Sequence, residues 1–256
     1  MEGARLRPRL ARYLAGVAFV CSTLALAGTP SLEQERARFE AADAQLNAVY
    51  ADAARELPAG AFEELRLDQR RWLERRDPYA EDVAHLEAGA AGLTDPEDEP
   101  WFWIARTERT LARSEVLGGW LSYYRGLPAE AGWSGAWADG DGGWLLMLDD
   151  GSAHLAFDLF VVRGPTHHLG QLEGVAERIG RSARFATASV WDEAPTWLTF
   201  VAEGPRVRLW AENARWFHGM RAYFDGDYVR VRALTEEERG QLESLLAQAF
   251  EDDGER

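Results

Sequence analysis

The spacing of apolar residues in the first half of the chain is helical. Up to about residue 125, apolar side chains recur every three or four positions, as along the buried face of a helix. The pattern predicts three helices, over residues 32–57, 61–87 and 101–124. Pro58-Ala59-Gly60 separates the first two, and residues 87–100 read as a loop before the third. Pro78 and Gly118-Gly119 mark the points at which a helix could be interrupted.

From Trp133 the pattern changes to short apolar alternations separated by Gly, Asp and Pro. Turn signals recur about every ten residues, which favours an antiparallel barrel or sandwich. In one run, alternate residues define two faces, with Leu155, Phe157, Leu159 and Val161 on one and Ala156, Asp158, Phe160 and Val162 on the other. Thr235-Glu236-Glu237-Glu238 has the form of a capping box and starts a helix to about Phe250. The chain is therefore predicted to be α+β.

The stretch LRLDQRRWLERRD, residues 65–77, holds five arginines. On a helix they do not form one basic stripe, because the face that packs is shared by Leu65, Gln69, Trp72 and Arg76. If the first two helices fold back on each other at Pro58, the residue numbers of two facing positions, one on each helix, add up to about 119. This rule pairs Leu57 with Phe62, Tyr50 with Gln69, Asn47 with Trp72 and Asp43 with Arg76. We expect Asp43 and Arg76 to form a half-buried, bidentate ion pair that fixes the register of an antiparallel hairpin.

These facing residues resemble a known family motif. The elements D-x-x-L-N-x-x-Y at 43–50 and Q-R-x-W-x-x-x-R-D at 69–77 resemble the LprI-type, lysozyme-inhibitor-like N-terminal domain of exported bacterial proteins. The resemblance covers residues 36–80 and extends to T-L-A-R at 110–113, and the helical domain is expected to span 32–127. The resemblance implies a structural role for the motif residues, which are Asp43, Asn47, Tyr50, Gln69, Trp72, Arg76 and Asp77. It implies a helical fold and, for some members, inhibition of lysozyme.

The chain departs from this family at two positions. The family usually has one cysteine three residues after the Arg-Asp and another before the threonine of the third helix. Here those places are Ala80 and Ala105, as would follow from the loss of one disulfide.

The β-domain, expected at 132–250, has a thinner resemblance. Gly132-Trp133-x-Gly135-x-Trp137 is similar to the first strand of lipocalin-like barrels, and barrel-like domains follow the helical domain in some family members. The barrel core is expected to be filled by tryptophans, namely Trp133, Trp137, Trp144, Trp191, Trp197, Trp210 and Trp216.

The N-terminal segment and the charge indicate an exported protein. Basic residues, the apolar run Tyr13–Ala27 and an A-x-A site at Ala25-Leu26-Ala27 predict a signal peptide over residues 1–27. Its removal takes away four arginines and one glutamate, so a formal charge of -15 becomes -18, and the only cysteine, Cys21, is lost. We therefore expect a periplasmic or secreted protein with no membrane anchor after cleavage. So acidic a chain is not expected to bind nucleic acid.

No catalytic motif is found, and neither an enzyme nor a cofactor or metal is expected. The segment Ala138–Gly143 lacks the ligands of a calcium loop and predicts a hairpin turn. The loop Arg163–His168 follows an apolar strand and collects polar donors. If the barrel is open, this loop and His218 would line its mouth, which makes the candidate binding residues Arg163, His167, His168 and His218. The alternative is a strand-ending turn with a solvated Arg163.

Three functions are consistent with the sequence. The favoured one is an exported binding protein whose partner, as the resemblance implies, is a lysozyme-like cell-wall hydrolase. Lysozymes are commonly basic, so the acidic charge would speed their encounter with this protein. The second is a small-molecule carrier that uses a cavity inside the barrel, lined by some of the tryptophans. The third is a structural module of the cell envelope.

Overall fold

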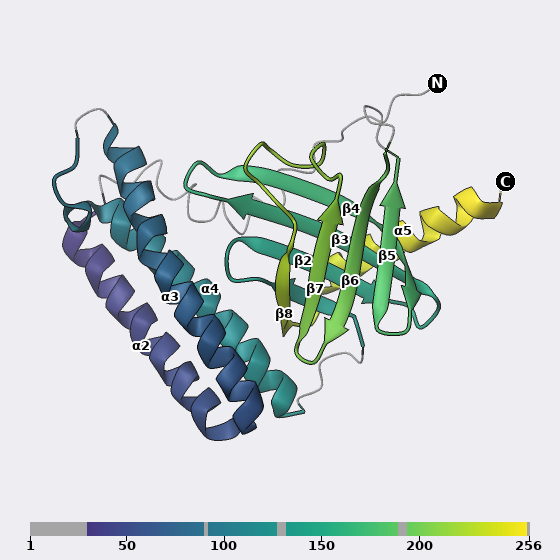
Figure 1. Ribbon diagram of the computed structural model, residues 1–256, viewed down its shortest axis with the longest axis horizontal. Coiled ribbons are helices and arrows are strands. Elements are labelled where there is room, and N and C mark those ends of the chain that lie inside the picture. Colours follow the sequence, from purple (N-terminus) through teal and green to yellow (C-terminus); the bar gives the residue numbers. More distant parts are fainter. Residues whose placement is uncertain (1–29, 90–91, 127–131, 189–193, 255–256) are drawn as a thin grey trace.

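The computed structural model describes residues 30–89, 92–126, 132–188 and 194–254. The predicted signal peptide lies outside them. Helices α2 (Leu32–Glu56), α3 (Ala59–Ala88) and α4 (Pro100–Tyr124) lie beside a closed barrel, with the short 3₁₀ helix η2 (Pro96–Asp98) before α4 (Figure 1). Helices followed by an antiparallel barrel and a terminal helix confirm the predicted α+β class.

Neither of the two predicted weak points interrupts a helix. Pro78 lies inside α3 and has no N–H to donate to the carbonyl of Glu74, four residues earlier. Both residues are exposed, so water can replace the missing hydrogen bond. Gly119 lies inside α4, and a β-carbon there would collide with the backbone of Arg230 and the side chain of Val229. Gly119 therefore allows α4 to lie directly on the barrel.

The predicted packing face of α3 is buried, with exposed fractions of 2% for Trp72 and 7% for Arg76, but Asn47 of α2, which was expected to face Trp72, is exposed. The expected bidentate pair is wrong, because Arg76 makes one long contact to Asp43, at 3.4 Å, and donates through Nε to Asp77 at 2.7 Å. The guanidinium also lies over the rings of Phe39 and Trp72, 5.4 and 5.3 Å from their centroids. The aromatic rings and Asp77 thus hold Arg76 in place, and Asp43 contributes less than expected.

The barrel is a simple antiparallel meander, in which each strand pairs with the next and the first pairs with the last. Its strands are β1 (Gly135–Ala138), β2 (Gly143–Asp149), β3 (His154–Arg163), β4 (His168–Ile179), β5 (Ser182–Thr187), β6 (Thr196–Glu203), β7 (Arg206–Glu212) and β8 (Gly226–Arg232). The sequence left barrel and sandwich open, and the pairing of β1 with β8 decides for the barrel. The bundle packs on this seam through a shared apolar cluster that includes Trp72, Val116, Trp120, Ala138 and Val229.

Both faces of β3 are buried, but by different elements. The residues in step with Leu155 belong to the barrel interior. On the outer face, Ala156 packs with Leu242 and Leu246 of α5 (Glu236–Gly254), and Asp158 accepts a hydrogen bond from Gln241. The predicted capping box is confirmed, since Thr235 N donates to Glu238 and Glu238 N donates to Thr235 Oγ1 at 2.8 and 3.2 Å.

The expectation that all seven tryptophans fill the barrel is wrong. Trp133 and Trp137 belong to the interior cluster, and Trp144 packs toward the helices. Three others lie on outward or exposed positions, namely Trp197, Trp210 and Trp216. Trp191 lies outside the described residues. The interior is filled instead by Phe, Leu and Met side chains, whose positions alternate along the strands with these outward residues.

Candidate functional site

The turn between β1 and β2 carries two carboxylates with different partners. Asp139 accepts hydrogen bonds from the backbone N–H groups of Asp141 and Gly143, both at 2.8 Å, which closes the turn. Gly142 has a φ of 93°, and a β-carbon on it would collide with the carbonyl of Val162. The hairpin turn predicted for this segment is confirmed. Both carboxylates are bound by arginine guanidinium groups, one from the barrel and two from the bundle.

Arg163 is the barrel's partner for this turn. It is the last residue of β3 and its side chain is 3% exposed, so the alternative of a solvated Arg163 is wrong. Its guanidinium pairs with Asp139 at 2.6 Å and donates to the carbonyls of Asp141 and Tyr223 at 3.0 and 3.2 Å. Burial opposes the charged form, but the charge of Asp139 outweighs it, and the pKa of Arg163 is raised.

The pKa of Asp139 is lowered. Burial alone would raise it, but Arg163 and the backbone donors of the turn outweigh burial. Both shifts favour the charged forms of Asp139 and Arg163, which pair at the end of the barrel that faces the helices.

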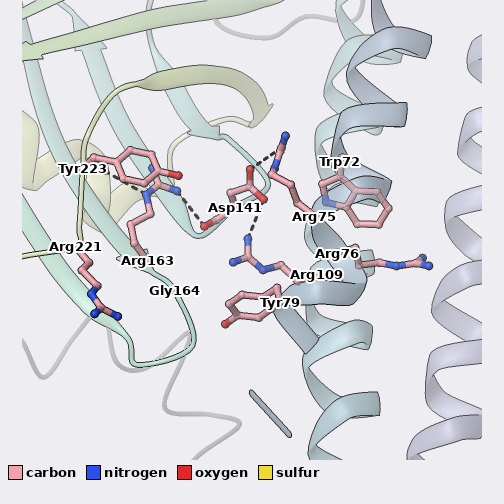
Figure 2. Close-up of a pocket in the computed structure, with 10 residues that line it drawn as sticks. All are labelled: Trp72, Arg75, Arg76, Tyr79, Arg109, Asp141, Arg163, Gly164, Arg221 and Tyr223. Carbon is pink, nitrogen blue, oxygen red and sulfur yellow. Dashed lines mark hydrogen bonds and ion pairs between the residues drawn. The ribbon is translucent and has the colours of Figure 1, made fainter. Parts of the chain in front are cut away.

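Two arginines of the helical bundle bind the second carboxylate. Arg75 of α3 and Arg109 of α4 contact the two oxygens of Asp141 at 3.0 and 2.9 Å. Figure 2 shows Asp141 between these guanidinium groups, with Arg163 and Tyr223 on the barrel side. One turn of the barrel thus joins both regions: Asp139 is held by the barrel and Asp141 by the helices.

A pocket of about 280 Å³ lies at this junction. Its helical wall has Trp72 and Tyr79, and its barrel wall has Gly164 and Tyr223 (Figure 2). Arginines lie over two of the rings, with Arg109 at 3.9 Å from the centroid of Tyr79 and Arg163 at 4.5 Å from that of Tyr223. Five arginines line the pocket, namely Arg75, Arg76, Arg109, Arg163 and Arg221. The only carboxylate among the lining residues is Asp141, so the pocket is strongly cationic in an acidic protein.

Of the four candidate binding residues, Arg163 alone lines this pocket. His167 is exposed in the turn after β3, with a φ of 52°, and His168 accepts from or donates to Thr166 at 2.8 Å. His218 packs edge-on against Phe224 at 5.3 Å, and its backbone bridges to Gly170. The structure therefore does not gather the four residues into one site, although all lie near the same end of the barrel.

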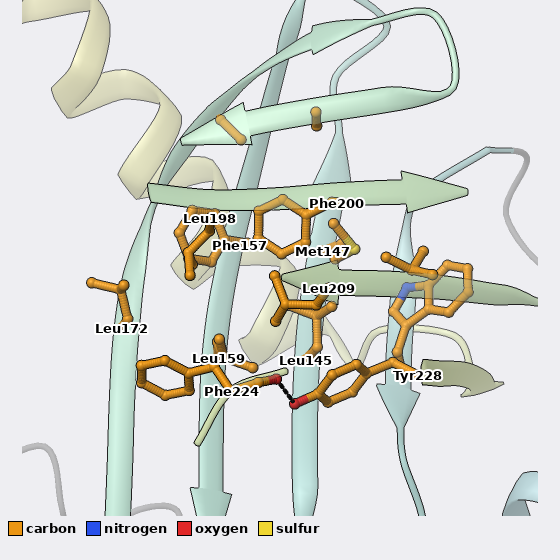
Figure 3. Close-up of a cluster of buried hydrophobic side chains, with 14 of the residues drawn as sticks. Leu145, Met147, Phe157, Leu159, Leu172, Leu198, Phe200, Leu209, Phe224 and Tyr228 are labelled. Atoms are coloured by element: carbon orange, nitrogen blue, oxygen red, sulfur yellow. Dashed lines mark hydrogen bonds between the residues drawn. The ribbon is translucent and has the colours of Figure 1, made fainter. Parts of the chain in front are cut away.

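The barrel interior is filled with side chains rather than open. Figure 3 shows Phe157, Phe200, Leu145 and Leu209 meeting at its centre. Tyr228 is also buried there; burial and then the charge of Asp139 raise its pKa well above the usual value. Its hydroxyl donates to the carbonyl of Phe224 at 2.8 Å. This packing gives no support to the hypothesis of a carrier with an internal ligand.

Of the family-motif residues, Gln69, Trp72 and Arg76 are buried on the packing face of α3, whereas Asn47 of α2 is exposed. Gln69 accepts a hydrogen bond from Arg113 of α4 at 2.7 Å, and Asn47 donates to Asp43 at 2.9 Å. Asp77 binds both Arg76 and Arg106. The contacts of Gln69 with Arg113 and of Asp77 with Arg106 join α3 to α4, whereas the other two lie within one helix. The contacts between helices are consistent with a structural role for Gln69 and Asp77.

The two positions at which the family usually has cysteines belong to one buried apolar cluster. Ala80 and Ala105 are 0% and 4% exposed and belong to the same apolar cluster, together with Phe39 and Phe102. In place of a disulfide, the two alanine side chains pack as part of this apolar core.

The end of the bundle around the connection from α3 to α4 is acidic. Residues 81–99 contain seven carboxylates and no arginine, and the carboxylates are Glu81, Asp82, Glu87, Asp95, Glu97, Asp98 and Glu99. All but Glu99 are exposed. The nearby Arg36 donates to the backbone carbonyl of Glu97 and so leaves the side chain negative. We call residues 81–99 the acidic end; its described parts, 81–89 and 92–99, lie at the upper left of Figure 1.

Comparison with known proteins identifies the helical region. Residues 30–115 match the family model described as "Lysozyme inhibitor LprI". No curated protein and no solved structure matches the chain. Along the described residues, no helix combines the length and apolar character needed to cross a membrane. The three-helix region, matched over residues 30–115, is therefore a domain of the lysozyme inhibitor LprI family, followed in the same chain by an eight-stranded antiparallel barrel.

Proposed function

We propose that this protein is exported and inhibits a lysozyme-like cell-wall hydrolase by direct contact with the acidic end of its helical bundle. The family match carries the proposal, because the matched domain includes this whole end. The electrostatics support it. Seven carboxylates without an arginine create a local negative field that attracts a basic enzyme and speeds association.

The acidic end is a suitable contact surface because its exposed carboxylates form few contacts within the protein. Elsewhere on the bundle, acidic side chains are largely paired, as in the contacts of Glu56 with Arg125 and of Asp77 with Arg106. At the acidic end, by contrast, the described residues form no ion pair with Glu81, Asp82, Glu87 or Asp98. Unpaired exposed carboxylates are available to arginines and lysines of a partner without first breaking an internal contact.

The experiment is a titration of the mature protein into lysozyme activity assays at low and moderate salt. We expect inhibition that weakens as salt rises, since exposed charges are screened over about 10 Å at 0.1 M. A quadruple variant, Glu81→Gln, Asp82→Asn, Glu87→Gln and Asp98→Asn, should need at least about ten times more protein for half inhibition.

A matched control separates the surface from the total charge. Four exposed carboxylates of the barrel and α5 are neutralised instead, by Glu177→Gln, Glu212→Gln, Glu236→Gln and Glu243→Gln. Both variants change the net charge by the same amount, so only the first should lose inhibition. Equal losses would place the contact elsewhere, and no inhibition of any of several lysozyme classes would remove the proposal.

Export is tested separately. Expression of the full chain in a bacterium, followed by fractionation and N-terminal sequencing, should give a periplasmic or secreted protein that starts at Gly28. A cytoplasmic protein with its first residues intact would contradict this part.

A further inference from the structure

We propose that the pocket between the helical bundle and the barrel binds a small organic anion, in which a carboxylate or phosphate group is attached to a flat ring. This proposal does not depend on lysozyme inhibition, because the pocket and the acidic end are formed by different residues. It rests on the charge balance, the walls and the unmet donors of the pocket.

The charge balance favours an anion. Arg163 is neutralised by Asp139, and Arg76 contacts Asp43 and Asp77. The remaining three arginines face one carboxylate: Arg75 and Arg109 share Asp141, and Arg221 has no ion pair among the described residues. A single carboxylate cannot compensate three guanidinium groups, so the pocket keeps an excess positive charge for a ligand to neutralise.

The excess is specific to this pocket. A neighbouring hollow at the same junction is lined by three arginines but also by Asp68, Asp139, Asp141, Asp225 and Asp227. Carboxylates outnumber arginines there, so an anion would be repelled from it. Both hollows share Asp141, and the difference between them comes from Arg109 and Arg221 on one side and the extra aspartates on the other.

The walls favour a flat body behind the anionic group. The rings of Trp72, Tyr79 and Tyr223 line the pocket, and arginines lie over the last two. Rings with a cation on one face leave an edge or the other face for stacking against a ligand ring. With a volume of about 280 Å³, the pocket suits a small molecule rather than a polymer.

Two donors are available to such a ligand. The indole Nε1 of Trp72, whose side chain lines the pocket and is 2% exposed, has no hydrogen-bond partner among the described residues. An acceptor at that wall would satisfy it. Arg221 lines the pocket from the barrel side with an exposed side chain, which can turn toward a bound anion at little cost.

The test measures binding of benzoate and phenyl phosphate to the full mature protein by calorimetry and by quenching of tryptophan fluorescence. Benzamide is the neutral control of the same shape as benzoate. We expect at least one anion to bind and benzamide to bind at least about tenfold more weakly, since charge-assisted hydrogen bonds supply the difference. Preference for benzoate or for phenyl phosphate tells which anionic group the pocket takes.

Variants locate the site. Arg221→Gln should weaken anion binding about tenfold without changing stability, because no described residue pairs with Arg221. Arg70→Gln is the control, an exposed arginine of α3 that does not line the pocket. Equal binding of benzamide, no binding of either anion at millimolar concentration, or the same affinity in the Arg221 and Arg70 variants would each overturn the proposal.

Discussion

The buried pair of Arg163 and Asp139 offers the sharpest test of how the junction is held together. Replacing Arg163 with Met keeps an unbranched chain in the same space but removes the guanidinium. Asp139 would then be a charged carboxylate with its side chain 8% exposed and no cation beside it. Its two backbone donors remain, so the turn itself can persist.

The expected loss is large. Removing one member of a buried ion pair typically costs about 3–5 kcal/mol, because the remaining charge stays buried without compensation. Here no discount for solvent is needed, since both side chains are less than 10% exposed. The double variant Asp139→Asn, Arg163→Met should recover about 2 kcal/mol or more of this loss, because an uncharged amide replaces the stranded carboxylate.

The pH dependence distinguishes a stranded charge from poor packing. In the native protein the pKa of Asp139 is lowered, so its contribution to stability is present above about pH 4, the unfolded value, and is lost as the pH falls through the folded value. In the variant, burial remains without Arg163 and the pKa of Asp139 rises. Protonation then relieves the defect, so the difference in the free energy of unfolding should shrink between pH 7 and pH 4.5.

The assay is urea unfolding of both single variants, the double variant and the native protein at these two pH values. A loss below about 1 kcal/mol for Arg163→Met, or the same loss at both pH values, would refute the reasoning about a compensated buried charge.

Further predictions concern the helices and the junction. Gly119→Ala should destabilise the protein by about 1–3 kcal/mol because a β-carbon there meets the backbone of β8. Gly118→Ala, with open space around it, should stabilise the protein by up to about 1 kcal/mol. Melting temperatures that shift in the same direction for both variants would contradict this. Ala80→Cys with Ala105→Cys should form a disulfide under oxidising conditions and add about 3 kcal/mol that a reductant removes, and free thiols after oxidation would show that the two positions do not face each other. Asp141→Asn should cost about 1–2 kcal/mol by weakening the contacts of Arg75 and Arg109 across the junction, while Asp150→Asn in an exposed turn should change unfolding by less than about 0.5 kcal/mol.

The helices were predictable because their signals are local. Apolar spacing gave α2, α3 and α4 nearly to the residue, and the summed positions of a hairpin placed Arg76 on a buried face. The hairpin rule predicted that the Arg76 guanidinium would bind Asp43 alone. In the structure it also contacts Asp77 and the rings of Phe39 and Trp72. These further contacts depend on side-chain geometry and not on spacing.

The junction was harder to predict because its parts are distant in sequence. Alternation along β3 puts Arg163 in step with Leu155 and Val161, and this signal could have indicated that Arg163 points into the barrel. No local sequence pattern shows that Arg163 meets Asp139. Nor does one show that Arg75 and Arg109 bind Asp141 from helices about 30 to 70 residues away in the sequence. The choice between barrel and sandwich was open for the same reason, since it depends on pairing the first strand with the last.

We propose that the acidic end of the LprI-family domain meets the partner enzyme. Hydrogen–deuterium exchange of the mature protein, with and without a basic lysozyme that it inhibits, reads this surface directly. Added protection is predicted in peptides that cover residues 81–99, with the barrel strands unchanged. Protection confined to the barrel or to α5 would contradict the claim.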